Sequence, residues 1–394
     1  MLKMFSASTN ELDDAKVAVK EILEQLNLSE NQRKNSAAII TAYQDTDDEV
    51  IKAVAKSLPF ESIGITTFMS ATDKQSDYMQ IIVSVFTSDD VEFAIGCSDN
   101  IVKGSDSEIV EALKETIAKI KNPQAIFGCA PFLSYANVDY YTRIMNQINP
   151  KILFFSSVSV DNTADFHLNR TIFNGEKFEK RAAFIVLGGE KAKLNFDFAI
   201  ATVSPEKAFR SQEDAVVTKS APGLLIEINN EPASKYLNSL GFEQDDNGKF
   251  TTINANPIMV DFNDGTQEAV RGMLGFTPDD SFIIGGDIPV GTKIAVSQFE
   301  ISDIVKTTTQ TLTEFVEKNK NASGFILYSC CGRYFNLGFQ HGMKEIETVQ
   351  KIINAAKKPF LFSYVCGEMC PMYKNENELV NRGHNYTCIM AAIY

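Results

Sequence analysis

The chain has 394 residues and a net charge of −14, with 44% apolar and 22% charged residues. This composition is typical of a folded globular protein and argues against a disordered or low-complexity chain. The acidic charge would be repelled by a nucleic-acid backbone, so we expect no nucleic acid as a partner. The length exceeds what one hydrophobic core usually serves, and more than one domain is therefore expected.

Signals for export or membrane insertion are not evident. The stretch MLKMFSASTNELDDAK at the N-terminus has no basic segment followed by a long apolar one, which argues against a secretory signal. The sequence offers no run of about 18 apolar residues for a transmembrane helix, so no membrane insertion is expected. Seven cysteines at irregular spacing favour reduced thiols over a disulfide framework. We therefore expect a cytoplasmic protein.

The first predicted elements alternate between helix and strand. Apolar residues at helical spacing predict a helix within residues 9–26, and the apolar run 37–43 follows it. A helix is expected over 48–58 and a strand over 62–69. The segment 78–99 contains two β runs around a Ser-Asp-Asp turn, which predicts a hairpin.

The same order of elements recurs twice, which indicates an internal repeat. The second copy predicts two helices at 109–120 and 138–148, two strands at 124–132 and 151–160, and later β runs at 171–175, 182–189 and 194–202. The third copy predicts helices at 311–319 and 344–356, strands at 324–331 and 359–366, and one final β run at 385–394. Capping boxes are expected for three helices, at Ser8 with Glu11, Thr46 with Glu49, and Ser105 with Glu108.

Continuous apolar strands between helices predict mixed sheets covered on both faces, and hence a mixed α/β fold of repeated helix-strand-helix-strand-hairpin units. Residues 213–305 differ because short strands alternate with turn signals, so we interpret them as a β-rich connector. These turn signals are Asp245-Asp246-Asn247-Gly248, Asp279-Asp280 and Gly285-Gly286. The predicted domains are 1–212, with two units, and 213–394, with the connector and a third unit at 306–394.

Reactive and polar side chains concentrate at two predicted strand ends in the last quarter of the chain. Arg333 follows one of these strands and Glu368 follows the other. If the strands are parallel neighbours, both residues lie at the sheet edge where ligands of α/β proteins bind. Arg333 would hold a carboxylate in a bidentate fork, and Glu368 would accept from an ammonium or orient Arg333. Together they suit an amino-acid-like ligand.

Several alternatives stay open for these residues. Arg333 and Glu368 would also make a purely structural ion pair. Cys330 is interpreted as a packed support for Arg333, with Cys331 on the opposite face. A thiol-dependent hydrolase or transferase would use Cys330 as nucleophile, with His384 or His341 as base and Glu368 or Asn385 orienting that base. A zinc site would draw on Cys330, Cys366, Cys370 and His384.

Standard cofactor motifs are missing from the sequence. It contains no GxGxxG, GxxxxGK[ST] or HExxH motif and no paired CxxC, so nucleotide and zinc-finger interpretations lose support. We expect no cofactor and no metal.

Five short segments, taken in order, resemble the FIST-domain family, in which a FIST N-terminal region precedes a FIST C-terminal region. They are TIFNGEKFEKRAAFIVLGG (171–189), LLIEINNEPASKYL (224–237), YSCCGR (328–333), CGEM (366–369) and HNYT (384–387). The resemblance implies a sensory module that binds small ligands, amino acids being the usual proposal, and that often accompanies signalling output domains.

The resemblance sets the expected ligand and partners. The expected ligand is an amino acid or a related metabolite, and the expected ligand-binding residues are Cys330, Gly332, Arg333, Gly367, Glu368, His384, Asn385 and Thr387. This chain departs from the family's pattern in having Cys366 directly before the Gly-Glu pair, and in showing no output domain. A signalling partner protein is a further expectation, without a sequence feature that identifies it.

Overall fold

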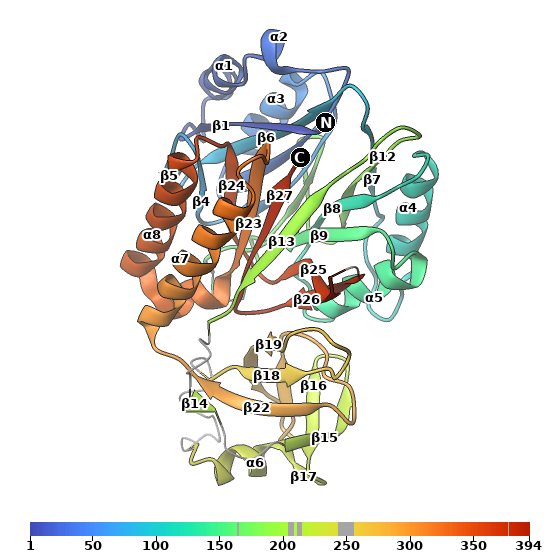
Figure 1. Cartoon of the computed structure of the whole chain (residues 1–394), viewed down its shortest axis with the longest axis vertical. Helices are drawn as coiled ribbons and strands as arrows, with labels where there is room; N and C mark the ends of the chain where they lie inside the picture. The colour runs from blue at the N-terminus through green and yellow to red at the C-terminus, as the bar shows by residue number, and fades with distance from the viewer. Residues whose placement is uncertain (164, 204–208, 211–214, 243–255, 377) are drawn as a thin grey trace.

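The protein is described by a computed structural model that covers residues 1–163, 165–203, 209–210, 215–242, 256–376 and 378–394. Within these residues, three six-stranded mixed sheets with helices form one body, and a nine-stranded sheet forms a β module at its lower end in Figure 1. The predicted mixed α/β fold class is confirmed.

Each body sheet is built on two parallel strands joined by a helix, which confirms the predicted repeat. The three copies are β2 (Asn35–Tyr43), α3 (Asp48–Ser57) and β3 (Ser62–Thr67); β8 (Ala125–Ala130), α5 (Val138–Ile148) and β9 (Leu153–Val158); and β23 (Gly324–Cys330), α8 (Cys331–Ala355) and β24 (Phe360–Val365). Their strands are buried almost throughout, as expected for parallel strands covered on both faces.

Neighbouring copies exchange strands. A hairpin that follows each parallel pair extends the sheet of another copy. These hairpins are β4 (Ser70–Thr72) with β5 (Ser76–Asp77) beside β24, β10 (Thr171–Phe173) with β11 (Glu176–Phe178) beside β3, and β25 (Glu368–Asn375) with β26 (Glu378–His384) beside β9. The three sheets are therefore interlocked by the chain itself.

The outer strands are exchanged in the same cyclic way. They pair as β1 (Lys3–Thr9) with β6 (Ile81–Ser88), β7 (Glu92–Cys97) with β12 (Ala183–Gly188), and β13 (Phe196–Ala201) with β27 (Cys388–Ile393). The third copy ends in the single strand β27, as predicted, and β1 at the start of the chain supplies the matching outer strand of the first sheet. The Leu2 amide donates to the Tyr394 carbonyl at 3.0 Å, so the two termini meet (Figure 1).

The predicted hairpin over 78–99 is wrong, because β6 and β7 lie in different sheets. Their alternation and turn signal are local features, whereas their partners β2 and β12 come from distant parts of the sequence. The sequence analysis also missed β1 and the hairpin β25–β26, whose polar outer half lacks the continuous apolar pattern of the inner strands.

The inner faces of the three body sheets share one apolar core, to which β1, β6, β8, β12, β23 and β27 all contribute. Helices cover the outer faces (Figure 1): α1 (Ala15–Leu26), α2 (Leu28–Asn31) and α3 lie together, as do α4 (Ser107–Ala118) with α5 and α7 (Ile301–Lys318) with α8. Burial of this shared core is the main force that holds the copies together.

The predicted capping boxes do not form at the first two helices. Asp14 caps α1 and Asp47 caps α3, each accepting from amides of the first turn, whereas Ser8 lies in β1. An aspartate nearer the helix start makes the same bond. At the third helix the N-cap residue is Asp106, and Ser105 and Glu108 contact each other through their side chains at 2.9 Å.

The β module confirms the β-rich prediction for the connector and has its own apolar core. Its elements are β14 (Phe209–Arg210), β15 (Ala215–Ala221), β16 (Leu224–Ile228), β17 (Glu231–Pro232), α6 (Ala233–Ser239), β18 (Ile258–Asp261), β19 (Ala269–Arg271), β20 (Met273–Phe276), β21 (Phe282–Ile284) and β22 (Lys293–Gln298). The chain turns as predicted at 279–280 and bends at 285–286. The predicted turn at 245–248 and the predicted boundary between 212 and 213 lie outside the described residues.

Candidate functional site

The two strands that end in the reactive segments are parallel neighbours, which meets the condition set in the sequence analysis. Cys330 at the end of β23 is in register with Val365 at the end of β24. The chain after β23 turns directly into α8, and the chain after β24 turns through Cys366 and Gly367 into β25. Both segments therefore meet at the carboxyl edge of one sheet, where ligands of α/β proteins bind.

Arg333 lies in the first turn of α8 and is completely buried. Its Nη2 lies 2.6 Å from Glu345 Oε1 and also donates to Thr308 Oγ1 and, at 3.1 Å, to the Ile304 carbonyl. Nη1 points toward the carbonyls of Ala201 and Tyr386, at 3.4 and 3.5 Å. Both terminal nitrogens are thus engaged within the protein, so a ligand carboxylate that pairs with Nη1 and Nη2 together would have to displace these partners. The Nε of Arg333 is buried without a hydrogen-bond partner among the described residues.

The alternative of a structural ion pair between Arg333 and Glu368 is therefore wrong, because Glu345 is the partner of Arg333. The reason lies in α8, which begins at Cys331 rather than at the predicted residue 344. Its backbone departs from helical geometry at Gly338, with φ of 67°, and the helix then carries Glu345 beside the guanidinium. No local spacing rule indicates a pair twelve residues apart across such a break.

Glu368, the first residue of β25, is also completely buried. Its Oε1 accepts from the Thr387 amide at 3.2 Å and from the Thr387 hydroxyl. Its Oε2 is buried without a hydrogen-bond partner in the described part of the chain. Burial and the neighbouring Cys330 thiol raise the pKa of Glu368 well above its usual range. The hydrogen bonds from Thr387 and the charge of Arg333 act to lower this pKa, but the net shift is upward. The carboxyl group therefore holds its proton to an unusually high pH.

Three thiols lie beside this carboxyl group. Cys331 and Cys366 belong to one apolar cluster. The neighbouring Cys331 thiol and burial raise the pKa of Cys330 well above the usual thiol value. Cys366 is partly exposed, whereas Cys330 and Cys331 are buried. Such thiols pack well but form the reactive thiolate poorly.

The two histidines proposed as bases lie elsewhere. His384 Nε2 lies 3.2 Å from the Cys370 carbonyl oxygen, and burial with the charges of Arg271 and Arg382 lowers its pKa to about 3. His341 lies on the exposed face of α8, with Nδ1 3.1 Å from the Leu337 carbonyl. Within the described residues neither ring is hydrogen-bonded to Cys330, so a cysteine–histidine pair is not assembled.

Asn385, Gly367 and Gly332 shape the same edge. The Asn385 amide nitrogen donates to the His384 carbonyl at 2.9 Å, while its Oδ1 is buried without a partner among the described residues. Gly367 has φ of +100°, and a Cβ there would lie 2.5 Å from Val138, so only glycine fits this turn. A Cβ at Gly332 would press on the Tyr386 ring at 3.2 Å.

The β module packs against this edge, through residues that the sequence analysis missed. Arg271 is fully buried and pairs with Asp139 of α5 at 2.8 Å, and it donates to the Gly383 carbonyl at 3.0 Å. Gly285 lies so close to Asn385 that a Cβ there would be 2.6 Å from Asn385 Oδ1. The carboxyl edge of β23 and β24 therefore faces the seam between body and module. A lone arginine in a short apolar strand was the available signal for Arg271.

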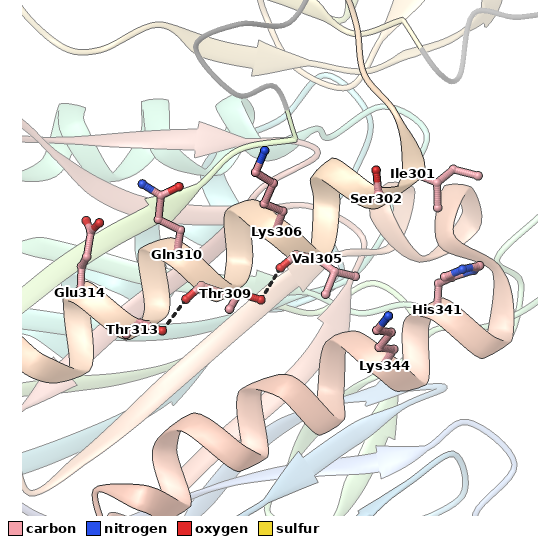
Figure 2. A pocket seen from close by; sticks show the side chains of 10 residues that line it. All are labelled: Ile301, Ser302, Val305, Lys306, Thr309, Gln310, Thr313, Glu314, His341 and Lys344. Carbon is pink, nitrogen blue, oxygen red and sulfur yellow. Dashed lines mark hydrogen bonds between the residues drawn. The ribbon is translucent and has the colours of Figure 1, made fainter.

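A cavity of about 720 Å³ lies along α7, toward α8. Figure 2 shows its lining, which is Ile301, Ser302, Val305, Lys306, Thr309, Gln310, Thr313, Glu314, His341 and Lys344. Of the residues singled out from the sequence, His341 belongs to it. The cavity and the buried cluster around Glu368 are thus two separate features.

Two further observations restrict the chemistry. In the part of the chain that the structure describes, no three His, Cys, Asp or Glu side chains are grouped so as to hold a metal ion, and this includes the cysteines and His384 of the zinc alternative. No helix among those residues combines the length and apolarity needed to cross a bilayer.

Comparison with known proteins identifies the family. The FIST N domain model matches residues 37–231, and the FIST C domain model matches residues 231–371. No curated protein matches the chain. FIST domains are sensory and signal-transduction domains, and the two matches follow each other over most of this chain in the order that the resemblance predicts. The chain belongs to the FIST-domain family.

Proposed function

We propose that this protein is a sensory module for a small metabolite with an ammonium group, an amino acid or a related amine, and that Glu368 binds that group. The observation that supports this is the buried carboxyl group at the carboxyl edge of parallel strands, whose Oε2 has no hydrogen-bond partner among the described residues. A buried acceptor without a partner costs free energy. An ammonium beside Oε2 would satisfy the acceptor and pair with its charge.

The neighbouring residues have separate roles in this proposal. Thr387 holds Oε1 and so aims Oε2 at the ligand. Asn385 offers a second acceptor, its unpartnered Oδ1. Cys330 packs beside Glu368. The terminal nitrogens of Arg333 do not contact the ligand in this proposal. Nη1 of Arg333 instead donates to the Tyr386 carbonyl and fixes that segment.

The position of the site suggests how binding becomes a signal. Glu368 lies in β25, whose partner strand β26 ends at the seam with the β module. A ligand in this place would change contacts between Asn385 and the module, and a partner protein would read the new arrangement. The reciprocal expectation is that the partner changes ligand affinity by the same factor.

We also propose that the protein acts in the cytoplasm. All seven cysteines are free thiols, and free thiols persist in a reducing compartment. Non-reducing mass spectrometry of the protein from its native cells would then find no disulfide, whereas a native disulfide would contradict this location.

The thiol-enzyme alternative has less support. A nucleophilic cysteine needs a lowered pKa or an adjacent base, whereas the pKa of Cys330 is raised and His384 lies against the Cys370 carbonyl. We therefore treat Cys330 as part of the packed wall of the site.

The test is a thermal-shift screen of amino acids and amines, followed by calorimetry of each stabilising compound in two buffers of different ionisation enthalpy. Binding of an ammonium lowers the pKa of Glu368, so we expect release of up to about one proton per ligand at neutral pH. Glu368→Gln should abolish both the stabilisation and the proton release. Stabilisation by no member of the set, or equal binding by Glu368→Gln, would contradict the proposal.

A further inference from the structure

A second feature of the body has no part in the site around Glu368. Five aromatic rings form a contiguous surface cluster, called here the aromatic patch: Phe68, Tyr78, Phe166, Phe335 and Phe339. Phe68 is fully buried and forms the floor, whereas Phe335 and Phe339 expose 51% and 58% of their surface. Exposed aromatic rings gathered in one place are unusual on a monomer surface and indicate an interaction site.

The rings stand at different angles around the floor. Tyr78 lies 6.3 Å from Phe68 and 5.9 Å from Phe339, in an edge-to-face arrangement with the latter. Phe335 lies 6.1 Å from Phe68 and 6.0 Å from Phe166. The interplanar angles run from 34° to 62°. The rings therefore present walls as well as a floor, rather than one flat surface.

The sequence maintains this exposure through a break in α8. Gly338 lies between Phe335 and Phe339 and has φ of 67°, ψ of 173°, a conformation open essentially to glycine alone. No atom lies within 4 Å of a Cβ placed there, so close packing is not what requires a glycine. The break turns two large aromatic side chains to the surface beside Tyr78.

Two aspartates lie beside Tyr78 and the adjoining Tyr43. Asp77 precedes Tyr78 and accepts from the Tyr78 amide at 2.6 Å. The Asn162 side-chain amide donates to the Tyr78 hydroxyl at 2.5 Å. The side chain of Asp45 is exposed. Burial of Tyr43 and, to a smaller extent, the charge of Asp45 raise the pKa of Tyr43 to about 12. The Tyr43 ring lies 5.9 Å from the Tyr78 ring.

The balance of charge around the rings favours a cation. The groups that donate to Asp77, the Asn10 side-chain amide at 2.7 Å and the Tyr78 backbone amide, carry no charge. Aromatic faces carry partial negative charge and attract cations, and the carboxylates would repel an anion. A neutral apolar ligand would gain nothing from these two acids.

We infer that the aromatic patch is a binding site for a small organic cation, of the class with an alkylated ammonium group. The cation would lie against the faces of Phe335, Phe339 and Tyr78, over Phe68. An alkylated ammonium fits better than a primary one, because its methyl groups pack on the rings and it needs no hydrogen-bond acceptor. This site does not depend on the function proposed for Glu368.

The test compares a cation with its neutral isostere on the full chain. Choline and 3,3-dimethyl-1-butanol have the same shape and differ in the charge. Calorimetric titration should give saturable binding of choline that is about tenfold tighter than binding of the alcohol, the discrimination expected of a partly desolvated cation–π site. Equal affinities, or no binding of choline, would overturn the inference.

Variants locate the binding. Phe335→Leu and Phe339→Leu keep an apolar side chain but remove the ring, and each should weaken choline binding about fivefold. Tyr78→Phe keeps the ring and should retain the affinity. Phe178→Leu, a ring on β11 outside the patch, is the matched control, and urea midpoints confirm that each variant folds. Unchanged affinity in both Phe335→Leu and Phe339→Leu would overturn the assignment.

A last comparison separates this site from the one at Glu368. Glu368→Gln should bind choline as the unmodified protein does. If Glu368→Gln loses choline binding while Phe339→Leu keeps it, choline occupies the Glu368 site and the inference about the patch is overturned.

Discussion

Arg333 is held by groups from separate parts of the body. Glu345 belongs to α8, Thr308 belongs to α7, and the Tyr386 carbonyl belongs to the segment before β27. All of these groups are buried. A charge in such surroundings depends on its partner, because removal of one member leaves the other buried and uncompensated.

Loss of one partner should therefore be costly. Glu345→Gln and Arg333→Met should each lower the free energy of unfolding by about 3–5 kcal/mol, as for other broken buried pairs. Urea denaturation measures this. Lys20→Ala removes one member of an exposed pair with Glu24 and is the control, for which we expect an unchanged midpoint. Equal midpoints for Glu345→Gln and Lys20→Ala would show that the buried pair is not structural.

Glu368 should make stability depend on pH. Its pKa in the folded state is raised, so the folded protein binds the proton more tightly than the unfolded chain does. The associated stability is complete below the unfolded pKa of about 4.3 and is lost as pH rises toward the folded pKa. Relative to Glu368→Gln, the unmodified protein should thus lose stability with rising pH. Parallel curves of unfolding free energy against pH for the two proteins would contradict the buried protonated carboxyl group.

The thiols provide a test of the enzyme alternative. Because the pKa of Cys330 is raised, its alkylation rate should rise only above the range of an ordinary thiol, which has a pKa of about 8.5. The partly exposed Cys366 should be alkylated before Cys330. Mass spectrometry of peptides after timed iodoacetamide treatment measures both. Rapid alkylation of Cys330 below pH 7 would restore a thiol enzyme as the better interpretation.

At the scale of elements, local sequence patterns predicted the parts of the fold that depend on local physics. The helix predicted at 138–148 has those bounds in the structure, because its apolar positions repeat at helical spacing and Asn137 caps it. The parallel strands were predicted from their continuous apolar runs. The helix α8 was predicted from residue 344 only, because Gly338 interrupts its pattern.

What depends on distant partners was not predicted. The pairing of β7 with β12, of β1 with β6 and of Arg333 with Glu345 follows from the three-dimensional arrangement of the copies. For the candidate site, the sequence predicted that the segments after β23 and β24 meet at one edge. It did not predict how the charges are paired there, because pairing is decided by side chains from other elements.

The break in α8 should require glycine for conformational reasons alone. Gly338→Ala should lower the free energy of unfolding by about 1–3 kcal/mol, because its φ of 67° is unfavourable for a residue with a Cβ. Gly275→Ala is the matched control, since a Cβ there also meets open space and its φ is outside the positive range. Equal urea midpoints for the two variants would contradict a strained break at Gly338.

At the scale of the whole molecule, three interlocked sheets form one body and a β module covers one edge of it (Figure 1). The first and last strands, β1 and β27, lie in different sheets, and the bond from the Leu2 amide to the Tyr394 carbonyl joins them. The module is attached by polar contacts such as Arg271 with Asp139. It also shares an apolar cluster with the body, in which Met259 and Val270 pack with Ile304, Leu337 and Tyr386. Such an arrangement suits a sensor in which the body holds the ligand and the module responds.

The most direct measurement of the central claim is a crystal structure of the protein with the most stabilising amine from the thermal-shift screen. The account predicts ligand density at the carboxyl edge of β23 and β24, with the ammonium nitrogen within hydrogen-bond distance of Glu368 Oε2. Ligand density at another place, with Glu368 Oε2 still buried and unpartnered, would contradict it.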